Sequence, residues 1–203
     1  MLPLLLIMPM LLVLSGCGGG GSPGQHPAGS SATSRLSSAT TRFESSRWGY
    51  TVTYPADWAR ASRPLTPPLM DPREILSVGS FPLRYRPTDC DAWAGSAQQD
   101  LGAGDAFVSV RETGNLSGAD YGNFPRRPGH FSAQFGQGPE RSLCPGGHGL
   151  LQEVRFSDAG RNFDVLLGFG SKVSDERRRE AYRTVDSLRF DPRKKPGWPA
   201  SPN

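Results

Sequence analysis

Alternating apolar and polar positions predict several β-strands in the middle of this chain. In RWGYTVTYP (47–55), every second residue carries an aromatic or β-branched side chain: Trp48, Tyr50, Val52 and Tyr54. A period of two in such residues indicates a half-buried strand, and Pro55 ends it. Shorter apolar runs predict further strands at 74–81 and 106–112.

A β-hairpin is predicted further along the chain. HGLLQEVRF (148–156) and RNFDVLLGFG (161–170) flank SDAG, whose residues are typical of a tight turn. One face of the second strand would carry the side chains of Phe163, Val165, Leu167 and Phe169.

Two segments have the features of helices. TDCDAWAGSAQQDLGAG (88–104) offers Thr88 or Asp89 as an N-cap, ends in glycines and would hold Cys90 in its first turn. SDERRREAYRTVDSLRF (174–190) offers Ser174 as an N-cap, followed by acidic residues that suit the positive end of the helix dipole. The apolar stripe of this second helix would consist of Ala181, Tyr182, Val185 and Leu188.

The N-terminal segment predicts export and membrane attachment. Residues 1–14 are apolar and uncharged, too few to span a bilayer but suited to the core of a signal peptide. Leu14-Ser15-Gly16-Cys17 resembles a bacterial lipobox, in which a peptidase cuts before the cysteine and the sulfur receives a diacylglycerol with acyl chains such as palmitate. The resemblance implies a signal peptide over 1–16 and a lipid anchor on Cys17. The alternative is an ordinary cleaved signal peptide, and the lack of Lys or Arg before the apolar run departs from the usual pattern.

Composition divides the rest of the chain into three parts. Residues 17–42 are mainly Gly, Ser, Thr, Pro and Ala, which predicts a flexible tether. We expect one globular domain over 43–191 and a disordered, basic, proline-rich tail over 192–203. Together with the predicted signal peptide and lipid anchor, this organisation predicts a domain on the extracytoplasmic side of the cell membrane, held there by lipid.

The cysteines and the net charge favour a disulfide and disfavour a metal site and nucleic-acid binding. If Cys17 carries lipid, Cys90 and Cys144 remain as an even pair in an oxidising compartment, which favours one disulfide over two free thiols. A metal site is disfavoured because no CxxC or HxxxH spacing accompanies them. The formal net charge of +4, from 23 Lys plus Arg and 19 Asp plus Glu, is too small for the footprint of a nucleic-acid-binding protein.

Two segments resemble a known superfamily. RWGYTVTYPADWARA is similar to the opening of PsbP-like domains, and EAYRTVDSLRF is similar to their closing helix with its D-S-L-x-F signature. This superfamily includes the PsbP subunit of photosystem II, a Ran-binding transport factor and many bacterial lipoproteins. The resemblance implies an α+β fold in which helices cover an antiparallel sheet. It implies binding to other proteins more than catalysis.

Candidate catalytic groups are few. His26 falls in the tether, His130 and His148 fall in predicted loops, and no G-x-S-x-G, phosphate-loop or H-E-x-x-H motif occurs. The nearest carboxylate pairs are explained by a helix cap, for Asp89 with Asp91, and by an exposed turn, for Asp71 with Glu74. We therefore expect no enzyme activity, no cofactor and no metal ligands.

One loop is the best candidate for recognition. NFPRRPGHF (123–131) places Arg126, Arg127 and His130 between prolines and aromatic residues, a combination that suits a carboxylate or phosphate on a partner. An ordinary loop with solvated arginines is the alternative.

The hypothesis from the sequence is a cell-envelope lipoprotein with a non-catalytic, protein-binding domain and an unidentified envelope partner. A carrier of a small lipid or cell-wall ligand is the first alternative, with Trp48, Tyr50 and Tyr54 lining its cavity. An undetected hydrolase is the second.

Overall fold

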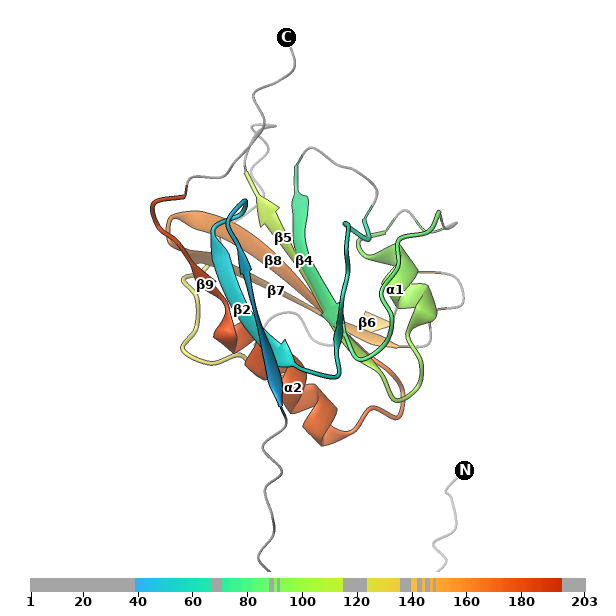
Figure 1. Cartoon of the computed structure of the whole chain (residues 1–203). Helices are drawn as coiled ribbons and strands as arrows, with labels where there is room; N and C mark the ends of the chain where they lie inside the picture. The colour runs from blue at the N-terminus through green and yellow to red at the C-terminus, as the bar shows by residue number, and fades with distance from the viewer. Residues whose placement is uncertain are drawn as a thin grey trace, which may run out of the picture. The chain divides into compact units, whose positions relative to one another are not determined.

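The part of the chain that the computed structural model describes forms two antiparallel β-sheets and two helices (Figure 1). This part comprises residues 39–66, 71–87, 90, 92–114, 124–135, 140–141, 144, 147 and 149–194. The predicted signal peptide, Cys17 and most of the tether and tail lie outside it. The domain is α+β, as expected, but the described strands form two sheets rather than one.

The smaller sheet, sheet A, contains the β1–β2 hairpin. Its strand order is β1 (Thr40–Ser45), β2 (Tyr50–Pro55) and β9 (Arg189–Phe190). The strand predicted over 47–55 is confirmed from Tyr50 onward. Trp48 lies instead in the turn between β1 and β2, where Gly49 adopts a positive φ of 59° that suits glycine.

The larger sheet, sheet B, contains the other strands. Their order is β3 (Ala59–Arg60), β4 (Arg73–Gly79), β5 (Ala106–Thr113), β8 (Arg161–Phe169), β7 (Leu150–Asp158) and β6 (Glu140–Arg141). The predicted β7–β8 hairpin is confirmed, and its two turn residues, Ala159 and Gly160, both have positive φ. Such turns match the twist of the strands that they join.

Sheet B is buried on both faces, which explains its nearly continuous apolar strands. On one face, Val108 and Val110 of β5 pack against sheet A and α2 (Asp175–Ser187). The predicted face of β8 belongs to this main core. On the other face, Phe107 and Leu166 pack under a second cluster that includes α1 (Gly95–Asp100) and the loops around it.

Helix α2 is confirmed over Asp175–Ser187, but the predicted segment ran to Phe190, and its last two residues form β9 instead. The Ser174 hydroxyl accepts a hydrogen bond from the Arg177 N–H at 3.1 Å, and two acidic residues follow it in the first turn. Ala181, Val185 and Leu188 are fully buried against the main core, and Tyr182 is half-buried beside them.

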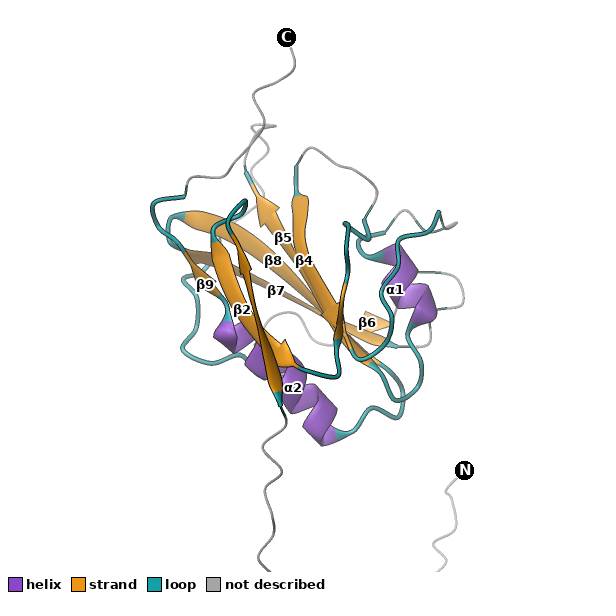
Figure 2. Cartoon of the chain, viewed as in Figure 1, coloured by secondary structure: helices purple, strands orange, loops and turns teal. Residues whose placement is uncertain are grey.

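The prediction for the other helix was wrong in extent. Helix α1 begins at Gly95, so Cys90 precedes it and does not lie in its first turn; the proposed caps, Thr88 and Asp89, lie outside the described residues. The backbone leaves the helical path at Ala94, which has a positive φ of 52° and donates its N–H to the Thr66 hydroxyl. The two described helices therefore cover little of the sheets, less than the sequence led us to expect (Figure 2).

Candidate functional site

A cleft of about 470 Å³ lies where sheet A approaches the β3–β4 edge of sheet B. Its walls come from β1 and the turn after it, from the loop that follows β3, and from the first half of β4. Among the described lining residues, the charged side chains are those of Arg47, Arg60, Arg63, Arg73 and Glu74. The cleft is thus lined by a clear excess of positive charge.

Two of these arginines converge on a single indole ring. The guanidinium carbons of Arg47 and Arg73 lie 4.8 and 5.3 Å from the ring centroid of Trp48. Arg47 and Trp48 belong to the β1–β2 turn, whereas Arg73 opens β4. The indole, which is half-buried, therefore joins the two walls of the cleft by cation–π contacts.

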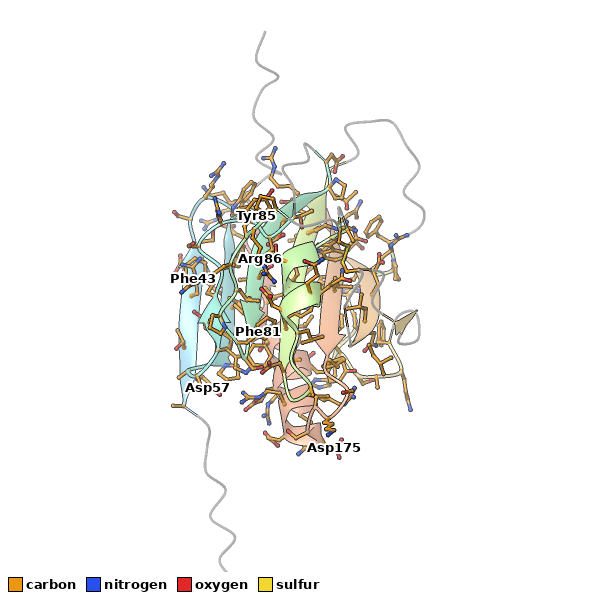
Figure 3. All side chains as sticks on the ribbon, turned by 90° about the vertical axis from the view of Figure 1, so that its right-hand side faces the viewer. Phe43, Asp57, Phe81, Tyr85, Arg86 and Asp175 are labelled. Atoms are coloured by element: carbon orange, nitrogen blue, oxygen red, sulfur yellow. A yellow bond between two sulfur atoms is a disulfide. The ribbon has the colours of Figure 1, made fainter. Side chains whose placement is uncertain are left out.

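The other two arginines lie over aromatic rings of their own. The Arg60 guanidinium lies 4.0 Å from the ring centroid of Phe43 and donates to the Ala61 carbonyl. The Arg63 guanidinium lies 4.9 Å from the ring centroid of Tyr85 and donates to the Tyr85 carbonyl at 3.1 Å. Phe43 lies on β1 and Tyr85 on the loop after β4 (Figure 3). The ring contact restrains each guanidinium, which has N–H groups left over for a ligand.

Three arginines of the cleft lack an ion-pair partner among the described residues. Within the described part of the chain, Arg47, Arg60 and Arg63 have no carboxylate within 4.0 Å, whereas arginines elsewhere, such as Arg127 and Arg161, form ion pairs. Since an arginine in a protein stays charged, the cleft attracts anions.

Glu74 contributes one negative charge to the cleft, and its carboxylate also holds the floor together. It accepts hydrogen bonds from the backbone N–H groups of Leu65 and Thr66, at 2.8 to 3.0 Å, and from the hydroxyls of Thr66 and Ser77, both at 2.6 Å. The residue is buried, with 7% of its surface exposed. The network continues from Ser77 through Ser109 to the indole N–H of Trp93, which belongs to the second cluster.

Tyr50 also lines the cleft. Its hydroxyl donates to the Ile75 carbonyl at 2.8 Å, which ties β2 to β4. Burial raises the pKa of Tyr50 well above its usual range, although the nearby Arg60 charge acts in the opposite direction. The phenol is thus a neutral hydrogen-bond donor, not a base.

The aromatic residues proposed to line a cavity separate into two groups. Trp48 and Tyr50 line the cleft, but Tyr54 does not appear among its lining residues and is buried in the main core.

The loop that we selected for recognition has both structural and exposed residues. Arg127 donates to the carboxylate of Asp158 at 3.0 Å and to three carbonyls at the end of α2, those of Val185, Asp186 and Leu188. Its guanidinium therefore caps the helix. Arg126 is exposed, and His130, with 92% of its side chain exposed, has Nδ1 3.6 Å from an Asp186 oxygen. A partner-binding role for Arg126 and His130 stays a prediction.

The predicted disulfide is present. Cys90 and Cys144 are bonded, with 5.4 Å between their Cα atoms. The bond links the segment before α1 to the segment between β6 and β7. It lies on the same face of sheet B as α1, and the Cys144 sulfur is 3.9 Å from the Gly95 carbonyl oxygen.

The other candidate groups have structural surroundings or lie outside the described part. Asp71 accepts from the Gly114 N–H, and its presumed partner Glu74 is the floor carboxylate described above. His26, His148, Asp89 and Asp91 lie outside the described residues. Within those residues, His, Cys, Asp and Glu side chains form no cluster that could hold a metal ion. No helix there has the length and apolar character that crossing a membrane requires.

The arginine cleft was missed by the sequence reasoning. Its arginines belong to three segments, and only the approach of the two sheets brings them together. The available signal was local: Arg47 directly precedes Trp48, and Arg60 and Arg63 follow the end of the predicted strand closely.

Comparisons with protein-family models, with curated proteins and with solved structures found no match for this chain. The proposals below therefore rest on the residues and their geometry.

Proposed function

We propose that this protein is a non-catalytic carrier that binds a small anionic ligand in the arginine cleft. The observation that carries the proposal is a cavity of about 470 Å³ in which Arg47, Arg60 and Arg63 have no carboxylate partner among the described residues. This volume falls within the range of small-molecule sites, which combine apolar walls with a few placed polar groups. The proposal against catalysis rests on the sequence, which lacks the motifs of a nucleophile, a phosphate loop or a metalloprotease.

Native mass spectrometry of the protein purified from its own host tests this carrier function. We expect an added mass on the native protein and its loss when Arg60 and Arg63 are both replaced by Gln. A matched variant replaces Arg42 and Arg84, two exposed arginines that precede Phe43 and Tyr85 in the sequence, and should keep the ligand. Native protein without any added mass, or equal loss in both variants, would argue against a carrier.

A protein-binding module is the second candidate. It is favoured by the exposed Arg126 and His130, which lie on a loop held in place by Arg127. A photocrosslinker placed at position 126 should then capture a specific envelope protein in the cell. Capture of the same proteins by an anchored control domain would count against this function.

We also propose that Cys17 carries a lipid that holds the domain on the extracytoplasmic face of the cell membrane. The support is the lipobox-like sequence at the end of an apolar segment. A Cys17→Ala variant should leave the membrane fraction, and a variant that stays there would contradict the anchor.

The PsbP-like fold is likewise a proposal. The two segments that carry the resemblance pack against each other, since α2 contacts β2 and the Ser187 hydroxyl bonds both the N–H and the carbonyl of Thr53, at 2.8 and 2.9 Å. Ser187 belongs to the D-S-L-x-F signature and Thr53 to the opening strand. Superposition of an experimental structure on a PsbP-like domain is the direct test.

A further inference from the structure

We propose that the arginine cleft recognises a phosphate group that carries at least two negative charges. This inference rests on the proposed carrier function and adds the chemical class of the ligand. Two sources share this chemistry: the phosphate of a lipid headgroup and a free phosphate compound such as pyrophosphate.

The net positive charge of the cleft favours a ligand with more than one negative charge. Arg47, Arg60 and Arg63 line the cleft without a carboxylate within 4.0 Å among the described residues, and the negative charge of Glu74 on the floor offsets only part of their positive charge. A ligand with one carboxylate would leave most of this positive charge uncompensated. A phosphate monoester carries between 1.5 and 2 negative charges at neutral pH, and a diphosphate carries more.

The size of the cleft favours a ligand whose charge is compact. A cavity of 470 Å³ is roughly 10 Å across if it is compact. Successive carboxylates on one face of an extended peptide are about 7 Å apart, because a strand advances about 3.3 Å per residue. An acidic peptide would therefore place only one or two of its charges inside, whereas a phosphate group concentrates its charge around one atom.

The hydrogen-bond donors of the cleft are guanidinium groups, which suit phosphate oxygens. Arg60 and Arg63 each donate one hydrogen bond to a backbone carbonyl, and a guanidinium offers five N–H groups. Both guanidinium groups lie over a ring, that of Phe43 or Tyr85, and this contact restrains them before the ligand arrives. A planar guanidinium binds phosphate oxygens in pairs. The half-buried Trp48 and Phe43 supply apolar contact for the organic part beside the phosphate.

Isothermal titration calorimetry on the full chain carrying Cys17→Ala tests the inference. The probes are pyrophosphate, a short-chain phosphatidic acid below its micelle concentration, and citrate as a compact carboxylate of comparable charge. We expect saturable binding of at least one phosphate probe, at one site per chain, and weaker binding of citrate. Tighter binding of phosphatidic acid would identify a lipid headgroup as the source, and tighter binding of pyrophosphate a free phosphate.

Matched variants place the binding in the cleft. Replacement of both Arg60 and Arg63 by Gln should weaken phosphate binding at least about tenfold, because hydrogen bonds to charged groups contribute that much or more. Replacement of both Arg42 and Arg84 by Gln changes the net charge equally and should alter affinity by less than about twofold, because neither residue lines the cleft. Far-UV circular dichroism and unaltered thermal midpoints establish that both variants fold.

Three results would overturn the inference: no binding of either phosphate probe, citrate binding as tight as phosphate binding, or equal loss in the two double variants. Failure of the phosphate inference can be distinguished from failure of the carrier function. If native mass spectrometry finds a cleft-dependent ligand while the phosphate probes fail to bind, the carrier function stands and only the phosphate class is wrong.

Discussion

The buried ion pair between Arg161 and Glu112 makes a demanding prediction about stability. The Arg161 Nε and Nη2 atoms donate to the two oxygens of Glu112 at 2.6 and 2.7 Å, and each side chain is only 2% exposed. The guanidinium also lies 5.2 Å from the ring centroid of Phe163 and 5.4 Å from that of Phe190. Both charges have therefore lost nearly all contact with water.

Removal of one partner should cost far more than removal of both. Arg161→Met leaves a buried carboxylate without its counter-ion, and Glu112→Leu leaves a buried guanidinium. Breaking a buried pair in this way costs about 3–5 kcal/mol, a large share of a total stability of about 5–15 kcal/mol. The double variant buries neither charge and should lie close to the wild type or be up to about 4 kcal/mol more stable. It also removes Arg161 Nη1, which has no hydrogen-bond partner in the described part of the chain.

Urea unfolding of the four proteins, followed by far-UV circular dichroism at neutral pH, measures this cycle. Equal m-values show that the compactness of the two states has not changed. The reasoning fails if either single variant loses less than about 1 kcal/mol, or if the two single losses add up to the double loss within about 0.5 kcal/mol.

Three further predictions concern other parts of the domain. Tyr50→Phe should lose about 0.5–1.5 kcal/mol at neutral pH, since it removes the bond to the Ile75 carbonyl. Burial raises the pKa of Tyr50 above the value near 10 of the unfolded chain. The contribution of Tyr50 to the free energy of unfolding is therefore complete below pH 10 and declines as the pH rises further. Urea unfolding of Tyr50→Phe should lack this alkaline decline, and a decline identical to that of the wild type would refute the prediction. Replacement of both Cys90 and Cys144 by Ser should cost on the order of 4 kcal/mol in urea unfolding, from the entropy of a loop with a sequence separation of 54, and a loss under about 1 kcal/mol would contradict this. Ser174→Ala removes the cap of α2 and should cost about 1 kcal/mol in thermal unfolding, whereas Ser171→Ala, in the exposed turn before it, should cost little and serves as the control.

The elements that could be predicted from the sequence are those whose signals are local. The β7–β8 hairpin combines a turn sequence with alternating apolar residues, and α2 combines the Ser174 cap with an apolar stripe. Neither pattern depends on a distant part of the chain. The disulfide followed from counting cysteines, once Cys17 was assigned to the lipid.

Helix α1 and the cleft depend instead on distant contacts. The segment before α1 has a helical pattern, but Trp93 donates its indole N–H to Ser109 and Ala94 donates to Thr66, and these bonds hold the backbone away from the helix. The cleft needs the β1–β2 turn to face β4, and no periodicity in either segment contains that information. Both features come from how the sheets meet.

The direction of the strands in sheet A has a mechanical consequence. β1 and β9 both pair antiparallel with β2, and they therefore run in the same direction. Thr40 lies opposite Pro55 at one end of β2, and the Arg47–Trp48 wall of the cleft lies beyond its other end. A pull between Thr40 and the Arg47–Trp48 wall would act along β1 and pass through the covalent backbone of that strand, so its hydrogen bonds to β2 would not have to open one after another. If the chain is anchored and binds a ligand as proposed, tension between Thr40 and the cleft would therefore not peel β1 from β2.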